Sequence, residues 1–327
     1  MAASDGGPLN GIGFGTWAWG NQLIWGYEPQ RDDAVLEATF RQAVASGLNL
    51  VDTADSYGTG RLNGRSELLL GRFTAALSAE SRAGLCIASK LAPFPWRLGR
   101  RGLVKAFQAS RQRLCGQLDR VQLHWSTARY APWQERPLLD GLADLVDQGD
   151  VRELGVSNVG PQRLRVLHDH LARRGVRLAS VQVQFSLLAP APIEPGGILE
   201  VCRNLGVEVL AYSPLALGVL ARRPDWTPSD ATLLRSGLFR RLLPGSRPLR
   251  QAMADMARAR GVSQVQVALN WCRAHGTCPI PGFRRPIQVE DARQALTWEL
   301  TAPERTQLDQ LSFDCSVRMP DNPFQSA

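Results

Sequence analysis

Residues 48–58 read LNLVDTADSYG, an apolar and β-branched run that ends in polar residues. A short apolar run of this kind is typical of a buried strand, and the polar residues after it begin the following loop. Similar runs recur along the whole chain. They predict eight strands, at Gly11–Thr16, Leu48–Asp52, Leu85–Lys90, Val121–His124, Glu153–Ser157, Val181–Phe185, Val207–Tyr212 and Cys278–Pro281.

Amphipathic stretches separate these runs and predict helices. Asp32–Ser46 carries apolar residues at helical spacing and is followed by a glycine, which favours a helix end. Leu138–Val146 and Leu164–Leu171 repeat the pattern. Six of the seven steps between successive strand ends are close to one βα unit of roughly 30 residues. This alternation predicts an α/β fold, a (β/α)8 TIM barrel that forms a single domain over residues 1–327.

Two segments depart from a plain repeat. The last step is about twice as long as a βα unit, and its excess, Arg222–Pro248, is rich in Arg, Pro and Gly, which predicts a long functional loop after the seventh strand. We also expect a β-hairpin-like start at the N-terminus. Residues 11–15 read GIGFG, but a turn-rich aromatic stretch follows them instead of a helix, which disfavours a doubly wound dinucleotide fold.

The composition is ordinary for a globular protein, with 44% hydrophobic and 21% charged residues among 327. No apolar stretch is long enough to span a membrane, and residues 1–7 lack the basic and apolar regions of a signal peptide. The six cysteines show neither CxxC pairs nor metal-ligand spacing. We therefore expect reduced thiols and a cytoplasmic location.

The net charge of +8 is spread along the chain. Its densest run, Arg97–Lys105, mixes basic with apolar residues and predicts the solvated face of a helix, not a patch for nucleic acid. We expect no nucleic-acid or membrane partner, and a monomer or small homo-oligomer. Of the 38 basic residues only Lys90 and Lys105 are lysines, which makes a lysine at a strand end informative.

Four polar side chains follow the ends of three successive predicted strands: Asp52, Tyr57, Lys90 and His124. In a (β/α)8 barrel these ends meet at one rim, where active sites lie. An ammonium near a phenol lowers the phenol pKa from about 10, and a carboxylate keeps the ammonium in place. With a histidine that hydrogen-bonds a substrate oxygen, the set suits a general acid acting on a carbonyl. Taken singly, the four have ordinary explanations: a loop cap, a core aromatic, a surface charge and a buried histidine.

Short motifs accompany this set in a fixed order: Gly13–Trp17, Asp52–Gly58, Lys90, His124, Gly155–Asn158, Gln182, Phe185–Leu187, Ala211–Leu215 and Ile280–Gly282. With them, the chain resembles the aldo-keto reductase superfamily over nearly its whole length. The resemblance implies an NADP(H)-dependent oxidoreductase that reduces an aldehyde or ketone to an alcohol, without metal or flavin. It implies that Tyr57 donates the proton, that Lys90 and Asp52 tune it, and that His124 orients the carbonyl.

The same resemblance implies a cofactor site. Ser157, Asn158 and Gln182 would hydrogen-bond the carboxamide of the nicotinamide, and Tyr212 would stack on its ring. Small residues after the seventh strand would meet the pyrophosphate through backbone N–H groups. The further cofactor-binding residues follow the first, seventh and eighth strands: Gly15, Thr16, Trp17, Ser213, Pro214, Leu215, Gly218, Leu220, Gly282, Arg284, Gln288 and Asp291.

The segment after the eighth strand indicates the cofactor preference. Arg284 stands where relatives place a residue for the adenosine 2′-phosphate, and guanidinium groups near a helix start favour such a phosphate. We therefore expect NADP(H) rather than NAD(H). The chain departs from the family at Asp291 and Ala292, where Glu and Asn are usual, which places one adenine hydrogen bond in doubt. Phe283 is a candidate to pack beside the adenosine.

Four aromatic residues predict a pocket for a flat or apolar carbonyl compound: Trp19, Trp25, Tyr27 and Trp125. Some of them have an alternative role, which is to close the mouth of the barrel, and the tail Ser312–Ala327 is a further candidate wall. No residue identifies a particular substrate. The alternative function is an NADP(H)-binding regulatory or scaffolding protein on the same fold, as in the potassium-channel β subunits. The complete set of four polar residues favours the enzyme.

Overall fold

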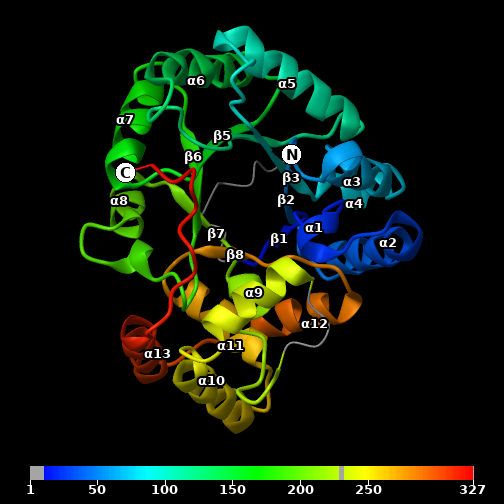
Figure 1. The fold of residues 1–327 in the computed structure, drawn as a ribbon. Helices are drawn as coiled ribbons and strands as arrows, with labels where there is room; N and C mark the ends of the chain where they lie inside the picture. The colour runs from blue at the N-terminus through cyan, green and yellow to red at the C-terminus, as the bar shows by residue number, and fades with distance from the viewer. Residues whose placement is uncertain (1–10, 228–231, 327) are drawn as a thin grey trace.

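Eight parallel strands follow one another around a ring, in the order β1 to β8 (Figure 1). The structure is a computed structural model, and it describes residues 11–227 and 232–326. The ring closes because the amides of Gly13 and Gly15 in the β1 segment donate to carbonyls of the β8 segment, at 3.1 and 2.9 Å. The strands are Phe14–Gly15 (β1), Leu50–Ala54 (β2), Cys86–Leu91 (β3), Arg120–Leu123 (β4), Glu153–Ser157 (β5), Leu178–Gln184 (β6), Glu208–Tyr212 (β7) and Cys278–Ile280 (β8).

Helices surround this ring and connect successive strands (Figure 1). They are Gln22–Trp25 (α1), Pro29–Ala45 (α2), Arg65–Ala75 (α3), Ala79–Ala83 (α4), Gly99–Arg113 (α5), Pro132–Asp147 (α6), Pro161–Ala172 (α7), Ile198–Leu205 (α8), Leu233–Leu242 (α9), Arg247–Arg260 (α10), Gln264–Ala274 (α11), Pro286–Ala295 (α12) and Ala302–Asp314 (α13). The predicted TIM barrel is therefore confirmed, with all eight predicted strands within a few residues of their observed positions.

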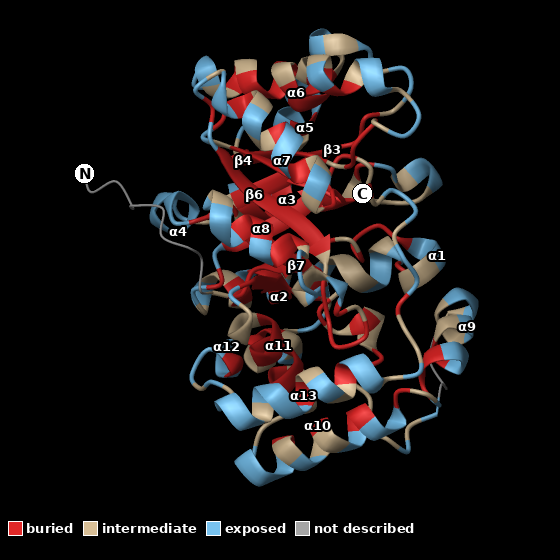
Figure 2. Ribbon diagram, turned by 90° about the vertical axis from the view of Figure 1, so that its left-hand side faces the viewer, coloured by how far each residue is buried: buried red, intermediate tan, exposed pale blue. Residues whose placement is uncertain are grey.

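The core lies in two layers. Outside the strands, apolar side chains of the helices pack on the sheet, and Figure 2 shows buried strands beneath helices with exposed outer faces. Inside the barrel, a smaller cluster contains Leu50, Leu210 and Ile280. Side chains alternate along a strand, so Leu50 and Asp52 both point into the barrel. The apolar cluster thus forms a floor, and the polar residues above it face the rim.

Two expectations change with the structure. The predicted loop Arg222–Pro248 contains α9 and the first residues of α10, because Leu238, Phe239 and Leu242 form an apolar face that packs on the core. Residues 228–231 of this segment lie outside the described residues. The β-hairpin-like start falls on residues before β1, and residues 1–10 are likewise outside them, while β1 itself pairs in parallel with β2.

The basic run Arg97–Lys105 overlaps the start of α5, and Arg100, Arg101 and Lys105 are exposed on it, as the pattern predicts. Arg100 forms ion pairs with Asp140 and Asp144 of α6, at 3.1 and 3.0 Å. A Cβ at Gly141 would lie 2.6 Å from the carbonyl oxygen of Arg100, so the glycine permits this close approach of α5 and α6.

Among the described helices, none is long and apolar enough to cross a membrane.

Gly58 provides a test of the turn that follows β2. Its φ is +120°, and an added Cβ would overlap the carbonyl oxygen of Leu62. We expect Gly58→Ala to lower the free energy of unfolding by about 3 kcal/mol, because the backbone must shift. Gly47 is the matched control: its φ is +76°, but a Cβ there meets no atom within 4 Å. Gly47→Ala should cost about 1 kcal/mol in urea unfolding, and equal losses for the two variants would contradict the prediction.

Candidate active site

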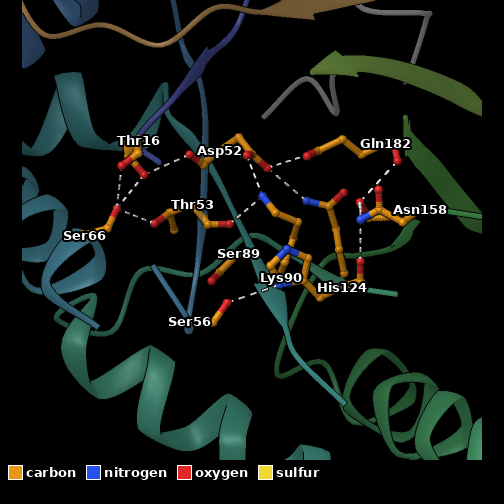
Figure 3. A network of polar contacts seen from close by, with 12 residues as sticks. Thr16, Asp52, Thr53, Ser56, Ser66, Ser89, Lys90, His124, Asn158 and Gln182 are labelled. Carbon is orange, nitrogen blue, oxygen red and sulfur yellow. Dashed lines mark hydrogen bonds and ion pairs between the residues drawn. The ribbon is translucent and has the colours of Figure 1, made fainter. Parts of the chain in front are cut away.

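An ion pair between Lys90 and Asp52 lies at the centre of the rim (Figure 3). Lys90 Nζ donates to Asp52 Oδ2 at 2.6 Å and to the carbonyl oxygen of Thr53 at 2.8 Å. Lys90 is 1% exposed and Asp52 is 2% exposed. The ladder of β2 and β3 aligns Ala54 with Lys90, so the two charged side chains point into the barrel from neighbouring strands. Burial lowers the pKa of Lys90, and the carboxylate of Asp52 opposes that shift.

The second oxygen of Asp52 is also hydrogen-bonded. Its Oδ1 accepts from Gln182 Nε2 at 2.7 Å and from Gln122 Nε2 at 3.3 Å. Gln182 is a predicted cofactor ligand, and this bond turns the carbonyl end of its amide away from Asp52. Gln122 was not predicted, although it stands two positions before His124 and therefore points to the same side of β4. Both amides complete the solvation of the buried carboxylate.

Tyr57 lies above the ion pair. Lys90 Nζ is 4.9 Å from the centre of the Tyr57 ring, and the ring of His124 is 6.0 Å from it, centre to centre. The sequence predicts that Lys90 lowers the pKa of Tyr57, but the structure reverses the sign. Burial and then the charge of Asp52 raise the pKa of Tyr57 well above its ordinary value of about 10. At neutral pH Tyr57 is therefore a phenol, which is the form that donates a proton.

His124 is an uncharged hydrogen-bonding group. Burial and then the charge of Lys90 lower the pKa of His124 well below 6.5. Its Nδ1 lies 3.4 Å from Ser56 Oγ (Figure 3). If the hydroxyl of Ser56 donates to Nδ1, Nε2 carries the proton of the neutral ring and is free to donate to a carbonyl oxygen. Ser56 was not predicted; its only signal in the sequence is its place beside Tyr57.

Asp55 is a third residue that sequence reasoning missed, after Gln122 and Ser56. It is 4% exposed, accepts from the amide of Ala92 at 3.2 Å, and forms an ion pair with Arg97. Burial raises the pKa of Asp55 to about 6, while Arg97 opposes the shift. Arg97 also donates to the carbonyl of Ala92 at 2.7 Å. The pair thus joins the turn that carries Tyr57 to the loop after β3.

Hydrogen bonds join the four predicted nicotinamide ligands beside His124. Asn158 Nδ2 donates to the carbonyl oxygen of His124 at 3.0 Å, and its Oδ1 accepts from the Tyr212 hydroxyl at 2.8 Å. Ser157 Oγ donates to the carbonyl of Gln182 at 3.2 Å. Asn158 has a φ of +57°, an uncommon value outside glycine that often marks functional sites. The geometry therefore places hydrogen-bonding groups that suit a carboxamide, together with an aromatic ring, at one edge of the site.

Basic and aromatic side chains gather at the other edge. The guanidinium carbons of Arg235 and Arg284 lie 4.4 and 5.7 Å from the centre of the Trp25 ring. Arg235 Nη2 donates to the carbonyl of Leu217 at 3.2 Å, beside Gly218, and its Nε is buried without a partner. Burial, and then the charges of neighbouring arginines, lower the pKa of Arg235 to about 10. Trp25 thus belongs to this edge and not to the predicted substrate pocket.

Two other predicted pocket residues lie away from the site. Trp19 is fully buried; its Nε1 donates to the carbonyl of Phe283 at 2.8 Å, and its ring packs against Phe73 of α3. Tyr27 is buried too, and its hydroxyl bonds with Asp33 and Arg65. The first loop runs outward after Trp17, and so it buries these rings between the strands and the helices.

Several predicted cofactor residues shape the backbone around the rim. Thr16 is fully buried: its Oγ1 donates to the carbonyl of Asp52 at 3.0 Å and accepts from Ser66 at 2.7 Å. Gln288 Oε1 accepts from the amide of Arg284 at 2.7 Å. Asp291 accepts from the hydroxyl of Ser263 at 2.7 Å. These hydrogen bonds position the loops. The side-chain oxygens of Gln288 and Asp291, which were predicted to contact the cofactor, accept hydrogen bonds from the protein itself.

Other predicted cofactor residues lie on the rim loops or beneath them. Phe283 stacks on Phe14 at 5.2 Å and is 1% exposed, so it belongs to the core and not beside an adenosine. Leu220 is also buried in the core. Gly15 and Gly282 form the bridge that closes the barrel. The remaining predicted cofactor residues follow the ends of strands β1 and β7. Pro214 is buried there, and the others are half-buried: Trp17, Ser213, Leu215 and Gly218.

An aromatic wall stands next to His124. Trp125 is 8% exposed, and its ring lies 5.1 Å from that of His124. Phe94 meets Trp125 edge-on at 5.9 Å, and Phe324 of the C-terminal tail stacks on it at 4.3 Å. Trp125 and Phe324 of the tail thus form an aromatic surface beside His124, and their part in a substrate pocket stays a prediction. Within residues 11–227 and 232–326, no three His, Cys, Asp or Glu side chains lie together as a metal-binding group.

Fold and site together define an oxidoreductase of the TIM-barrel class, and comparisons with known proteins make this specific. A sequence model described as "Aldo/keto reductase family" matches residues 11–312. The chloroplastic pyridoxal reductase of Arabidopsis thaliana is 48% identical over 98% of this chain and 88% of its own length. The chain belongs to the aldo/keto reductase family, and it is an enzyme of carbonyl reduction.

Solved structures agree with this assignment. An aldo-keto reductase from Klebsiella pneumoniae, determined in complex with NADPH, is 27% identical with a TM-score of 0.70, and the match covers 96% of this chain and 93% of that one. A thermostable aldo-keto reductase determined with the inhibitor epalrestat has a TM-score of 0.73 at 24% identity, over 95% of this chain and 98% of that one. The second likeness supports the barrel fold alone.

Tyr57→Phe tests the proton donor. The variant keeps the ring above Lys90 but lacks the phenolic proton, so kcat should fall by about 10²- to 10⁴-fold, while cofactor binding changes little. Tyr130→Phe is the matched control, because its hydroxyl bonds with Trp125 and the Pro93 carbonyl at the mouth. Steady-state kinetics and a fluorescence titration measure both effects. Unchanged turnover in Tyr57→Phe would remove this residue as the acid.

The charge of His124 is measurable directly. Because its pKa lies well below 6.5, the ring should stay neutral between pH 8 and about 6. The chain has four histidines, so ¹⁵N NMR of labelled imidazoles can follow each of them. The ¹⁵N signal that is missing from the spectrum of the His124→Gln variant is the signal of His124. A titration midpoint near the ordinary value of about 6.5 would contradict a neutral hydrogen-bond donor.

Proposed function

We propose that this protein uses NADPH to reduce a flat aromatic aldehyde of the pyridoxal type to the corresponding alcohol. The observation that carries the proposal is the buried Lys90–Asp52 pair beneath the phenol of Tyr57, beside the aromatic wall at Trp125. The relative at 48% identity, named a pyridoxal reductase, supports the substrate class. The reaction converts the aldehyde, NADPH and one proton into the alcohol and NADP⁺.

The protein's own groups account for the proton side of this reaction. When bound, NADPH supplies the hydride to the carbonyl carbon. Tyr57 gives its phenolic proton to the carbonyl oxygen, and His124 orients that oxygen as a neutral hydrogen-bond donor. The phenolate that remains lies near the ammonium of Lys90, whose Nζ is 4.9 Å from the ring centre. Asp52 holds that ammonium in place, and solvent then returns the proton to Tyr57.

The two edges of the site fit the two ends of NADPH. Ser157, Asn158 and Tyr212 offer hydrogen-bonding groups and an aromatic ring for the nicotinamide. At the other edge, Arg235 and Arg284 share one indole, and the Nε of Arg235 is buried without a partner. An uncompensated donor among like charges suits a phosphate dianion. These residues would hold the 2′-phosphate that distinguishes NADPH from NADH.

The substrate proposal rests on the wall beside the acid. The ring of Trp125 lies 5.1 Å from that of His124, and Phe94 meets Trp125 edge-on. Aromatic surfaces of this kind stack on flat rings. An aldehyde carried on a pyridine ring would place its ring against Trp125 and its oxygen between Tyr57 and His124. The wall thus favours aromatic over short aliphatic aldehydes.

We further propose that the protein works in a reducing compartment, of which the cytoplasm is the predicted one. All six cysteines are free in the structure. Burial raises the pKa of the Cys86, Cys202 and Cys278 thiols to about 12, so these thiols stay protonated and poorly reactive.

The test of function is direct. Purified protein with NADPH and pyridoxal should show loss of NADPH fluorescence and formation of the alcohol by chromatography. Propanal, at the same concentration, should react with a lower kcat/KM because it cannot stack on Trp125. Tyr57→Phe is the control for background reduction. Tight NADPH binding with no turnover of pyridoxal or of any other aromatic aldehyde would refute the proposal.

Arg284→Ala tests the cofactor preference. The variant should raise the Kd for NADPH about 10- to 100-fold, the value of a charge-assisted bond of about 1.5–3 kcal/mol, and should leave the Kd for NADH within about twofold. Arg101→Ala is a control of equal net charge, because Arg101 lies exposed on α5. Fluorescence titrations measure all four constants. Equal weakening of both cofactors would mean that Arg284 does not recognise the 2′-phosphate.

A further inference from the structure

The C-terminal segment Asn322–Ser326 lies across the residues assigned to the nicotinamide. Asn322 Nδ2 lies 2.9 Å from Asn158 Oδ1 and 2.9 Å from the hydroxyl oxygen of Tyr212. The backbone amide of Ser326 donates to the carbonyl of Asn158 at 3.1 Å. In Figure 1 this part of the chain, in red, runs from α13 back over the mouth of the barrel. The segment thus contacts the site through a side chain and through its backbone.

Further contacts hold the chain in place before and after Asn322. Phe324 stacks on Trp125 with ring centres 4.3 Å apart and an interplanar angle of 21°. Arg129 Nη1 donates to the carbonyl of Gln325 at 3.0 Å. Met319, before the segment, donates its amide to a carbonyl in the loop after β6 at 2.8 Å. The position of Asn322 is therefore fixed by its neighbours in the chain.

The side chain of Asn322 is a primary carboxamide, the same group that a nicotinamide ring carries. Its partner Asn158 Oδ1 already accepts from Tyr212 at 2.8 Å and from Asn322 at 2.9 Å. A carbonyl oxygen has two lone pairs, so both are in use. A nicotinamide carboxamide that donates to Asn158 must therefore displace one of the two donors. The hydroxyl of Tyr212 belongs to the site itself, which leaves Asn322.

We propose that Asn322 is an internal competitor of the cofactor, whose carboxamide occupies the place of the nicotinamide carboxamide until NADPH displaces it. The inference rests on NADPH binding at Asn158, as set out in the proposed function. The competition concerns the nicotinamide end alone. The arginines of the phosphate end, Arg235 and Arg284, lie around Trp25 at the opposite edge of the site. The adenosine half of the cofactor docks without displacing the tail, and the nicotinamide half docks only when the tail leaves.

The variant Asn322→Ala separates these two steps. It removes the two hydrogen bonds of the competitor, each with an effect of about two- to tenfold on an equilibrium constant. We expect the Kd for NADPH to fall about five- to tenfold. The Kd for 2′,5′-ADP, which carries the phosphates but no nicotinamide, should stay the same. Asp321→Ala is the matched control, because this exposed neighbour changes the tail without touching the competing carboxamide.

Four outcomes are distinguishable. Tighter NADPH binding with unchanged 2′,5′-ADP binding supports the competitor. An unchanged Kd for NADPH in Asn322→Ala overturns it, and so does weaker binding, which would make Asn322 a positioning residue for Asn158. If neither NADPH nor 2′,5′-ADP binds the unmodified protein, the proposed function fails first and the inference falls with it.

Hydrogen exchange on the unmodified chain gives a second test that needs no variant. Saturating NADPH should speed exchange at the amide of Ser326, because its bond to Asn158 is released with the tail. Exchange at the Met319 amide, before the segment, should stay the same. Slower exchange at Ser326 would show that the tail closes over the bound cofactor, and it would overturn displacement.

Discussion

A buried ammonium is stable in the barrel only because a carboxylate lies 2.6 Å away, and the rest of the site depends on that contact. Removal of one partner from such a pair leaves an uncompensated charge, at a cost of about 3–5 kcal/mol. Gln122 and Gln182 complete the arrangement, since their amides satisfy the oxygen of Asp52 that Lys90 does not use. The polar site therefore needs four strands to supply one stable ion pair.

Burial and the two charges of this pair set the protonation of its neighbours. The charge of Asp52 adds to burial in keeping Tyr57 a phenol, and the charge of Lys90 adds to burial in keeping His124 neutral. The same pair is connected to the cofactor end of the site. Gln182 donates to Asp52 through its side chain and accepts from the amide of Asn158 through its carbonyl, at 3.0 Å. Gln182 thus links the ion pair to the residues proposed to bind the nicotinamide.

The repeating strands and helices of the barrel were predictable from the sequence. The positions of side chains that depend on long-range packing were not. Strand period and helix spacing are local, so the eight strands and the residues at their ends, such as Lys90, followed from the sequence. The wrong expectations include Trp19, Trp25, Tyr27 and Phe283, because an aromatic residue type does not reveal whether its loop turns inward or outward. Gln122 could have been found from strand alternation, two positions before His124. Asn322 could not, since its partner Asn158 is 164 residues away in the chain.

The scarcity of lysine has a chemical consequence for the proposed reduction of an aldehyde. A free amine condenses with an aldehyde to form an imine, whereas a guanidinium, which stays protonated, does not react in this way. Of the two lysines, Lys90 is an ammonium bonded to Asp52 and 1% exposed, and Lys105 alone is exposed, on α5. The solubilising positive charge is carried by arginine instead. An aldehyde at the surface therefore meets a single exposed lysine side chain, Lys105, and the arginines that carry the positive charge do not form imines with it.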